Sequence, residues 1–293
     1  MEIINRRKRM MSVARRLRRE ENRTIGLVPT MGALHEGHLS LIHEARALCD
    51  VVVVSVFVNP AQFGPAEDFE AYPRDLTRDA ALLAEYNVDY VFAPTQEEIY
   101  PDGFSTYVMV ENLSNKLEGA ARPGHFRGVT TVVSILLNIV RPHFAFFGQK
   151  DAQQSIIVKQ MVRDLALDSE IVVLPTVREE SGLALSSRNE YLDQQERRAA
   201  VVLNRALLQA HAAYDAGDRS ASRLVDLVRG TIEAEPLARI DYVSLNDAGT
   251  LEKIDKIDEH PALLSVAVFI GKTRLIDNIV LGQTQKSAAT ALA

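Results

Sequence analysis

The chain contains one cysteine among its 293 residues, Cys49, so it can form no internal disulfide and has no cysteine spacing of a metal site. A single cysteine fits a reducing compartment, where disulfides do not persist. No apolar run approaches the length of a membrane span, and the basic N-terminus lacks the apolar core of a secretory signal. We therefore expect a cytoplasmic protein without a membrane partner.

Two common phosphate-binding signatures are also missing. The chain has no GxxxxGK(S/T) loop, and no GxGxxG pattern follows an apolar strand. A nucleotide site in this chain must therefore use another design.

Positive charge does not dominate the chain. The net charge is −6, which does not favour a nucleic-acid partner, and a composition of 47% hydrophobic and 25% charged residues is ordinary for a globular protein. A basic cluster near the N-terminus could bind nucleic acid. We favour a solvated helix instead, because no aromatic residues alternate with the basic ones and Val13 and Leu17 fit one apolar stripe. The cluster consists of Arg6, Arg7, Lys8, Arg9, Arg15, Arg16, Arg18, Arg19 and Arg23.

Short apolar runs alternate with helical patterns over the first part of the chain. The unbroken run at residues 51–58 is rich in valine, as in a parallel strand buried on both faces. The alternation predicts an α/β fold with a parallel sheet, whose ligands bind at the carboxyl ends of the strands. The predicted strands are residues 25–28, 51–58, 88–94, 107–110, 144–147 and 171–175, and the predicted helices are residues 38–45, 76–84, 129–140 and 156–165.

The pattern changes near residue 177. Two long helical stretches, 194–216 and 220–233, precede three strand candidates at 240–245, 263–270 and 273–279. Strands gathered after helices predict a small α+β domain with an antiparallel sheet. We therefore predict a first domain over residues 1–177, a smaller α+β domain over 178–282 and a disordered tail over 283–293.

The most informative stretch links the first predicted strand to a helix that begins near His38. Pro29 is expected to end the strand, and Gly32 and Gly37 let a ligand approach the backbone closely. A helix N-terminus presents free N–H groups and a positive partial charge, which together bind anions. His35 and His38 in that position suggest a phosphate ligand. The alternative is that both are surface residues that cap the helix.

Other polar groups follow later strands and could complete a phosphate clamp. Lys150 follows the strand at 144–147, and Ser186, Ser187 and Arg188 lie in a polar loop. Attack on the α-phosphate of a nucleoside triphosphate needs such donors to position and stabilise the spreading negative charge. Alternatively, Lys150 is a solvated lysine, and Arg188 pairs on the surface with Glu179 or Glu190.

Two glutamines suit a different ligand. Gln62 and Gln154 are neutral donor–acceptor groups that could orient a hydroxy acid, although isolated glutamines are commonly surface residues. Zinc at His35 and His38 is disfavoured, because the sequence contains no cysteine spacing of a metal site. A covalent serine nucleophile is disfavoured too, since neither serine has a GxSxG context or an evident base.

Taken together, these motifs resemble the pantothenate synthetase (pantoate–β-alanine ligase) family of the HxGH nucleotidyltransferase superfamily. The resemblance extends over nearly the whole chain. It departs at Leu185, where the family often has methionine, at Ser181, where aspartate is common, and at Phe269, where a basic residue is common. The matching segments are residues 29–38, 57–64, 72–74, 122–129, 147–151, 185–189 and 271–278.

The resemblance implies a Rossmann-like ATP- and pantoate-binding domain, a smaller lid domain and a homodimer. The implied reaction forms pantoyl adenylate and pyrophosphate from ATP and pantoate, after which the β-alanine amine gives pantothenate and AMP. Mg²⁺ accompanies ATP through ligands that the resemblance does not identify, and no tightly bound organic cofactor is expected.

The resemblance also implies roles for individual residues. His38 is the proton donor of the family, His35 and Lys150 meet the phosphates, and Gln62 and Gln154 hold pantoate, with Gln62 also serving β-alanine. The implied catalytic set is His35, His38, Lys150, Ser186, Ser187 and Arg188. The implied ATP site is Pro29, Met31, Gly32, Ala33, Leu34, His35, Glu36, Gly37, His38, Gly148, Gln149, Lys150, Asp151, Val177, Leu185, Ser186, Ser187 and Arg188.

Two other functions remain as alternatives. An adenylyltransferase of the same superfamily would need basic residues near Gln62 and Gln154 for a phosphorylated acceptor, and the sequence offers mainly amides there. A nucleotide-binding regulatory module that had lost catalysis should lack one of His35, His38, Lys150 or Arg188. All four are present.

Overall fold

The chain forms two compact units in a computed structural model that describes residues 1–65 and 67–282. The first unit comprises residues 1–179 and 184–189, and the second comprises residues 180–183 and the chain from Glu190 onward. The division begins close to the predicted boundary at residue 177, but residues 184–189 return to the first unit. The tail predicted for residues 283–293 lies outside the described residues.

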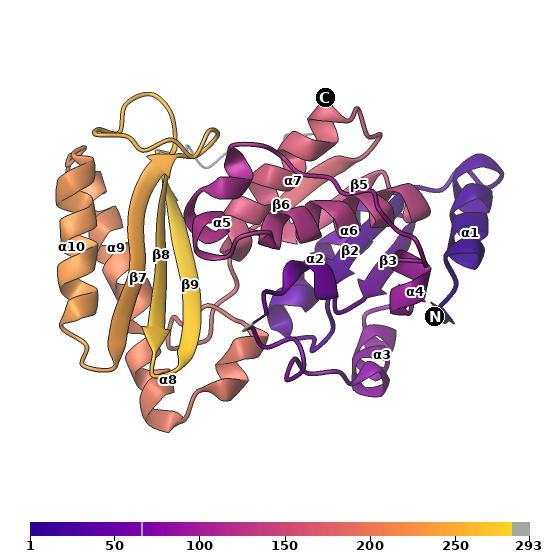
Figure 1. Ribbon diagram of the computed structural model, residues 1–293, viewed down its shortest axis with the longest axis horizontal. Helices are drawn as coiled ribbons and strands as arrows, with labels where there is room; N and C mark the ends of the chain where they lie inside the picture. Colours follow the sequence, from indigo (N-terminus) through magenta and orange to yellow (C-terminus); the bar gives the residue numbers. More distant parts are fainter. Residues whose placement is uncertain (66, 283–293) are drawn as a thin grey trace. The chain divides into compact units, whose positions relative to one another are not determined.

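A six-stranded parallel sheet forms the centre of the first unit, with the order β1-β4-β3-β2-β5-β6. This confirms the predicted α/β class. Figure 1 labels four of its strands, β2, β3, β5 and β6. From β2 the chain builds outward through β3 and β4, and then crosses to β5 and β6 on the other side. Ligands of such sheets bind where the order reverses, which here is between the carboxyl ends of β2 and β5. The strands are β1 (Glu2–Ile4), β2 (Ile25–Thr30), β3 (Val51–Val56), β4 (Tyr90–Phe92), β5 (Phe144–Gly148) and β6 (Glu170–Leu174).

Helices connect these strands, and the four that the sequence predicted are all present. The basic N-terminal segment is also a helix, α1, with a buried apolar stripe that includes Val13 and Leu17. No helix in the described ranges combines the length and apolar character needed to cross a bilayer. The helices are α1 (Arg7–Arg19), α2 (Glu36–Leu48), α3 (Leu76–Glu85), α4 (Gln96–Ile99), α5 (Leu117–Ala121), α6 (His125–Val140) and α7 (Ala152–Asp164).

The strand predicted at residues 107–110 is wrong, because this segment is a loop. The Val108 N–H donates to Thr131 Oγ1 (3.0 Å), and the Val108 carbonyl accepts from Thr130 Oγ1 (2.6 Å). Threonine hydroxyls of α6 therefore satisfy the backbone groups that a neighbouring strand would otherwise bind. An apolar run of four residues has the same sequence pattern whether it forms a strand or a loop held by side-chain hydrogen bonds.

The prediction that Pro29 ends the first strand is also wrong, since β2 continues to Thr30. The Thr30 carbonyl accepts from the Phe57 N–H (3.1 Å), so Thr30 faces β3. Adjacent residues of a strand point their backbone groups to opposite sides, so Pro29 faces β5. The pairing of β2 with β5 covers only Gly26 and Leu27, and the missing N–H of Pro29 therefore interrupts no ladder bond.

The hydrophobic core beside the sheet is formed by the short apolar strands and the helices that alternate with them along the sequence. One apolar cluster combines α2 residues such as Leu39 and Ile42 with Val52, Val54 and Phe146 of the strands. Burying each large apolar side chain contributes about 1.5–3 kcal/mol. This packing holds the N-terminus of α2 against the carboxyl end of β2.

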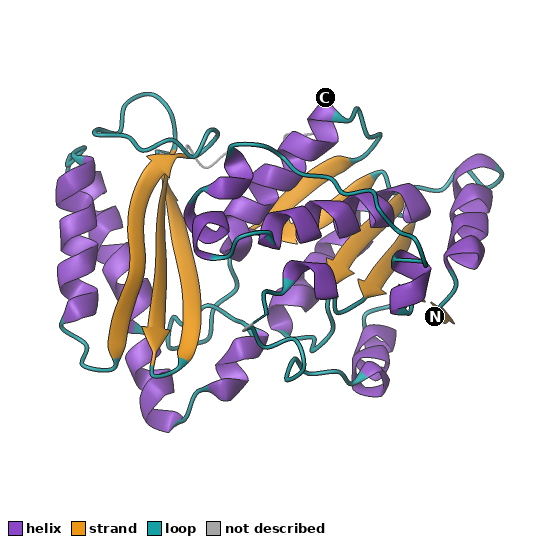
Figure 2. Ribbon diagram, viewed as in Figure 1, coloured by secondary structure: helices purple, strands orange, loops and turns teal. Residues whose placement is uncertain are grey.

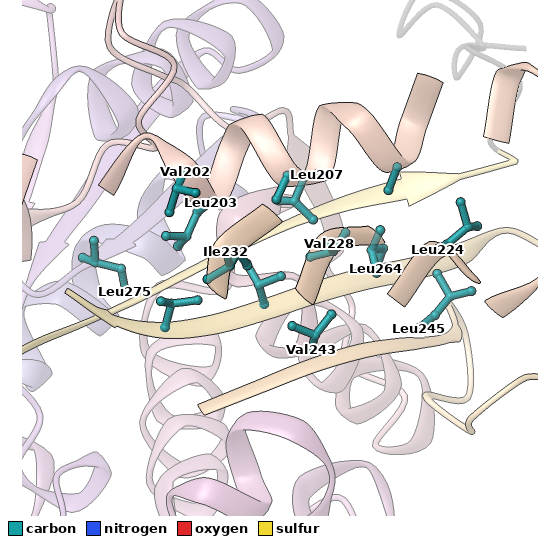
Figure 3. Close-up of a cluster of buried hydrophobic side chains, with 14 of the residues drawn as sticks. Val202, Leu203, Leu207, Leu224, Val228, Ile232, Val243, Leu245, Leu264 and Leu275 are labelled. Carbon is teal, nitrogen blue, oxygen red and sulfur yellow. The ribbon is translucent and has the colours of Figure 1, made fainter. Parts of the chain in front are cut away.

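The second unit contains the predicted antiparallel sheet, in the order β7-β8-β9, with helices on one face (Figures 2 and 3). Leu203 and Leu207 of one helix and Leu224 and Val228 of another pack on Leu264 of the central strand. The helix predicted at 194–216 is two helices separated at Val201. The elements are α8 (Gln194–Ala200), α9 (Val202–Asp215), α10 (Ala221–Glu233), β7 (Ala238–Asp247), β8 (Ala262–Ile270) and β9 (Thr273–Leu281).

A close backbone contact joins α6 to the turn that carries Gln62. A Cβ placed on Gly128 would lie 2.1 Å from the Ala61 carbonyl oxygen and 2.6 Å from the Gln62 nitrogen. The Gly128 carbonyl accepts from Asn59 Nδ2 (3.1 Å), which precedes the same turn, a 3₁₀ helix over Pro60–Gln62. Only glycine permits this approach.

We expect Gly128→Ala to destabilise the first unit, because the added methyl group would overlap main-chain atoms. Overpacking of this kind costs about 1–3 kcal/mol, measurable as a lower urea midpoint. Gly148→Ala is the matched control in the same unit, since its Cβ would meet nothing within 4 Å and its φ is −92°. Equal stability of the two variants would contradict the contact.

Candidate active site

One cavity of about 240 Å³ opens at the carboxyl ends of β2, β3 and β5, and all of its lining residues belong to the first unit. It brings together segments that lie up to 159 residues apart, from Pro29 to Arg188. Every residue of the implied catalytic set lines it, as do both glutamines. The site residues implied by the resemblance that line it are Pro29, Met31, His35, Gly37, His38, Gln62, Gly148, Lys150, Asp151, Gln154, Val177, Leu185, Ser186, Ser187 and Arg188.

Five residues of the implied ATP site do not line the cavity: Gly32, Ala33, Leu34, Glu36 and Gln149. Ala33 and Leu34 are buried behind it, Glu36 is exposed in the first turn of α2, and Gln149 lies in the 3₁₀ turn that follows β5.

The loop between β2 and α2 is held by a carboxylate that the sequence analysis did not single out. Asp79 of α3 is buried and accepts from the N–H groups of Ala33 and Leu34, both at 3.0 Å. Ala33 has φ +51°, a left-handed conformation that is unfavourable for alanine. The two charge-assisted hydrogen bonds stabilise this conformation and fix the backbone that leads to His35.

Both histidines cap α2 and face the cavity at the same time. His35 Nδ1 accepts a hydrogen bond from the Gly37 backbone N–H (3.1 Å). His38 Nδ1 accepts one from the His35 backbone N–H (3.4 Å). The rings lie side by side, with centroids 4.1 Å apart. Because each Nδ1 acts as an acceptor, each neutral ring carries its proton on Nε2. The capping alternative and the ligand-binding interpretation therefore describe the same arrangement.

Burial keeps both rings uncharged. Burial, reinforced by His35 beside it, lowers the pKa of His38 to about 3. Burial, reinforced by the positive charge of Lys150, lowers the pKa of His35 to about 4. Near neutral pH, the pair therefore offers two Nε2–H hydrogen-bond donors and no positive charge.

Two of the positive charges that line the cavity belong to Lys150 and Arg188. Lys150 Nζ lies 3.5 Å from Asp151 Oδ1. Burial by itself would raise the pKa of Asp151, but the charge and hydrogen bond of Lys150 together with the charge of Arg188 outweigh it, so the carboxyl pKa is lowered and the group is ionised. Arg188 makes a forked ion pair with Asp68, through Nε (3.2 Å) and Nη2 (3.0 Å). The partner of Arg188 is therefore Asp68 and neither Glu179 nor Glu190.

The serines lie beside this arginine. Ser186 Oγ accepts from the Arg188 N–H (3.3 Å), and Ser187 Oγ is 3.4 Å from the Tyr72 hydroxyl. Neither contact is to a histidine or carboxylate that would act as a base. These geometries suit hydrogen-bond donors to a ligand.

A relay of side chains fixes the amide of Gln62. Tyr100 OH donates to Asn59 Oδ1 (2.7 Å), and Asn59 Nδ2 donates to Gln62 Oε1 (3.1 Å). Gln62 Nε2 is 3.3 Å from Met31 Sδ, a weak acceptor that a ligand oxygen can replace. The relay thus leaves the NH₂ group of Gln62 as the donor for a ligand.

Arg122 and His125 also line the cavity, although the sequence analysis gave them no individual role. His125 Nδ1 donates to the Gln62 carbonyl (2.8 Å), and its Nε2 accepts from Arg122 Nη1 (3.3 Å). Burial, followed by the charge of Arg122, lowers the pKa of His125 to about 4. Arg122 itself is paired with Glu67 through two contacts of 2.6 Å. Both residues lie in the segment 122–129 that carried part of the family resemblance.

One wall of the cavity is apolar and comes from α6: Val129, Val132, Val133 and Leu136. Their spacing of three, four and seven places them on one face of the helix. The sequence predicted a helix over 129–140, but an apolar stripe that faces a ligand has the same spacing as one that faces the core.

The remaining side is a hairpin-like pair of segments. The Leu185 N–H donates to the Val177 carbonyl (3.0 Å), and Arg178 and Ala184 form an antiparallel bridge. Next to them, Thr176 Oγ1 is buried and has no hydrogen-bond partner among the residues that the structure describes. No group of three or more His, Cys, Asp or Glu side chains within those same residues could hold a metal ion.

Known proteins resemble this chain along nearly its whole length. The family model described as pantoate-beta-alanine ligase matches residues 2–280. A pantothenate synthetase from Pelotomaculum thermopropionicum is 58% identical over 265 residues, which cover 90% of this chain and 94% of that protein. One from Herpetosiphon aurantiacus is 55% identical over 257 residues, which cover 88% of this chain and 93% of that protein.

Two solved structures agree with these sequence matches. Pantothenate synthetase from Thermus thermophilus superposes with a TM-score of 0.89 at 46% identity, covering 95% of this chain and 99% of that one. Pantoate-beta-alanine ligase from Francisella tularensis, complexed with beta-gamma ATP and beta-alanine, gives 0.79 at 38% identity, covering 98% of this chain and 100% of that one.

We expect ¹⁵N NMR of histidine-labelled protein to show His35 and His38 as neutral Nε2–H tautomers down to about pH 5, well above their lowered pKa values. In the unfolded control in urea, the same rings should titrate near about 6.5. Since unfolding then takes up protons only below this value, the two histidines should leave stability unchanged above about pH 7 and lower it as the pH falls toward 4. Titration of either ring near pH 6.5 in the folded protein would contradict the arrangement.

Proposed function

The chain belongs to the pantoate–β-alanine ligase family, and on this premise we propose that it joins pantoate to β-alanine with ATP, releasing AMP and pyrophosphate. The product is pantothenate, and the enzyme is an amide-forming ligase. The observation that carries the proposal is the convergence of the paired histidines, Lys150 and Arg188 with Gln62 in one cavity.

In the first step, a carboxylate oxygen of pantoate attacks the α-phosphorus of ATP, and pyrophosphate leaves. Negative charge moves toward the phosphate oxygens, so the protein has to position the reactants and supply donors. We assign this task to the Nε2–H groups of His35 and His38, to Lys150 and to Arg188. Ser186 and Ser187 add donors near Arg188, and no covalent bond to the protein is formed.

The histidine chemistry follows from burial. The resemblance gives His38 the role of proton donor, whereas a pKa of about 3 makes its ring neutral. We therefore propose that both rings donate hydrogen bonds through Nε2 and keep their protons. Attack by a carboxylate requires no proton transfer in the first step, because the nucleophile is already an anion.

Pantoate suits the part of the cavity next to the phosphate clamp. It has a carboxylate, two hydroxyl groups and two methyl groups on one carbon. The amides of Gln62 and Gln154 match the polar groups, and the α6 wall of Val129, Val132, Val133 and Leu136 matches the methyl groups. In the second step, the neutral amine of β-alanine attacks the acyl carbon, AMP leaves, and the amine loses a proton.

A competing reaction, transfer of AMP to a phosphorylated acceptor, would place a second phosphate near the glutamines. Arg122 is the basic group beside Gln62, but both of its strong contacts are to Glu67, so its charge is already balanced. This pairing favours the ligase over the transferase. The alternative of a regulatory module without catalysis is also disfavoured, since His35, His38, Lys150 and Arg188 all line the cavity.

We further propose that ATP binds as its Mg²⁺ complex, with the metal carried mainly by phosphate oxygens and water, as Mg²⁺ commonly is. Asp151 is the acidic side chain in the described cavity that could assist. A lid role for the second unit and a homodimer are proposed from the family resemblance, and a cytoplasmic location is proposed from the single cysteine.

The proposed reaction predicts a strict substrate requirement for AMP release. With ATP, Mg²⁺, pantoate and β-alanine together, we expect continuous AMP formation, measured by coupled assay. Omission of either pantoate or β-alanine should abolish turnover. Sustained AMP release without β-alanine, or none with the full mixture, would exclude the ligase reaction.

We expect His38→Ala and Lys150→Ala each to lower turnover at least about a hundredfold, since one well-aimed donor is worth about 10²–10³ in rate. His43→Ala and Lys159→Ala are the matched controls, because these side chains are exposed on α2 and α7. Circular dichroism checks that each variant is folded. Near-normal activity of a folded clamp variant would remove that residue from the mechanism.

A further inference from the structure

The ion pair between Arg188 and Asp68 occupies the arginine that the proposed function assigns to ATP. Both contacts are short, from Nε to Oδ2 (3.2 Å) and from Nη2 to Oδ1 (3.0 Å). The two side chains are mostly shielded from water, with 30% and 24% of their surface exposed. The guanidinium is thus already bound edge-on by a carboxylate.

A carboxylate and a phosphate compete for the same edge of a guanidinium. Each presents two oxygen atoms to two parallel N–H groups, so only one of them can fill a given fork. The fork formed by Nε and Nη2 of Arg188 is filled by Asp68. A triphosphate that uses this fork must therefore first displace the carboxylate.

We propose that Asp68 is an internal competitor of ATP: its carboxylate holds Arg188 while the site is empty and yields the guanidinium to the phosphates when the nucleotide binds. This inference rests on the proposed function, because it assumes that ATP reaches Arg188. Asp68 is then a positioning residue that sets nucleotide affinity without taking part in the chemistry.

The surroundings of Asp68 allow this exchange without unfolding the segment. Its neighbour Glu67 stays anchored to Arg122 by two contacts of 2.6 Å. Phe69 packs against Phe63, with ring centroids 5.3 Å apart, and none of these contacts involves Arg188. Movement of the Asp68 side chain alone would release the guanidinium.

Loss of the Asp68 carboxylate would also remove a negative charge next to Arg188, which lines the cavity proposed to receive a polyanion. Like charges at close range repel even where solvent weakens the interaction. Both effects act in one direction, so loss of the carboxylate should tighten ATP binding. The affinity for adenosine, which lacks phosphates, should not change when the carboxylate is lost.

The test is Asp68→Asn, which keeps the shape of the side chain and removes its charge. We expect the Kd of a non-hydrolysable ATP analogue, measured by titration calorimetry, to fall about two- to fivefold, the range of a partly exposed ion pair. The KM for ATP should fall in parallel, and adenosine affinity should stay unchanged. Glu70→Gln is the matched control, with the same charge change on an exposed side chain two residues away, and should leave the Kd of the analogue nearly unaltered.

Other outcomes are equally decisive. Weaker analogue binding or a lower kcat at unchanged KM would overturn the proposal, because Asp68 would then orient Arg188 for the bound nucleotide. Equal tightening by Asp68→Asn and Glu70→Gln would reduce it to a general charge effect and also overturn it. If neither wild type nor variant bound ATP, the proposed function itself would fail.

A measurement on the wild-type protein covers the case in which the variant does not fold. Pyrophosphate added to ¹⁵N-arginine-labelled protein should shift the Nε resonance of Arg188 as the phosphate replaces the carboxylate. The same addition should leave the Nε resonance of Arg122 in place, since its partner is Glu67. An unshifted Arg188 resonance at saturating pyrophosphate would overturn the exchange.

Discussion

The free N–H groups at the start of α2 are the constraint on which the site depends. A helix that begins beside a cavity has to satisfy these groups locally, and here imidazole nitrogens do so. His35 Nδ1 binds the Gly37 N–H, and His38 Nδ1 binds the His35 N–H. This use of Nδ1 fixes the tautomer of each ring and points Nε2–H outward. The buried carboxylate of Asp79 holds the preceding loop, including the left-handed Ala33, so that the two rings are placed by the backbone.

Charge is distributed around these neutral rings in balanced pairs. Lys150 lies beside Asp151, Arg188 is paired with Asp68, and Arg122 is paired with Glu67. Each of these positive groups thus has an acidic partner, which limits the cost of burying it. At Arg188, the proposed exchange of Asp68 for a phosphate would let a polyanion bind without an isolated positive charge having to be buried beforehand.

The part of the cavity around Gln62 is formed by an oriented amide and an apolar helix face. Its polar group, the Gln62 amide, is oriented by Asn59 and Tyr100, and its apolar side is one face of α6. The contact of Gly128 with the Ala61 carbonyl brings the two together. Specificity for a small hydroxy acid would therefore depend on helix packing as much as on the amides.

The sequence by itself determined the fold class, the order of most strands and helices, and the segments that form the site. Apolar periodicity carries this information, because it reflects which side of each element is buried, and the His35–His38 motif matched a known family. It misplaced the short segments at Pro29 and 107–110, where hydrogen bonds to the β3 backbone and to threonine hydroxyls of α6 decide the outcome. Tertiary structure alone decided the tautomers, the lowered pKa values, and the pairing of Arg188 with Asp68, 120 residues away. These depend on which groups share a buried volume, and spacing along the chain does not encode that.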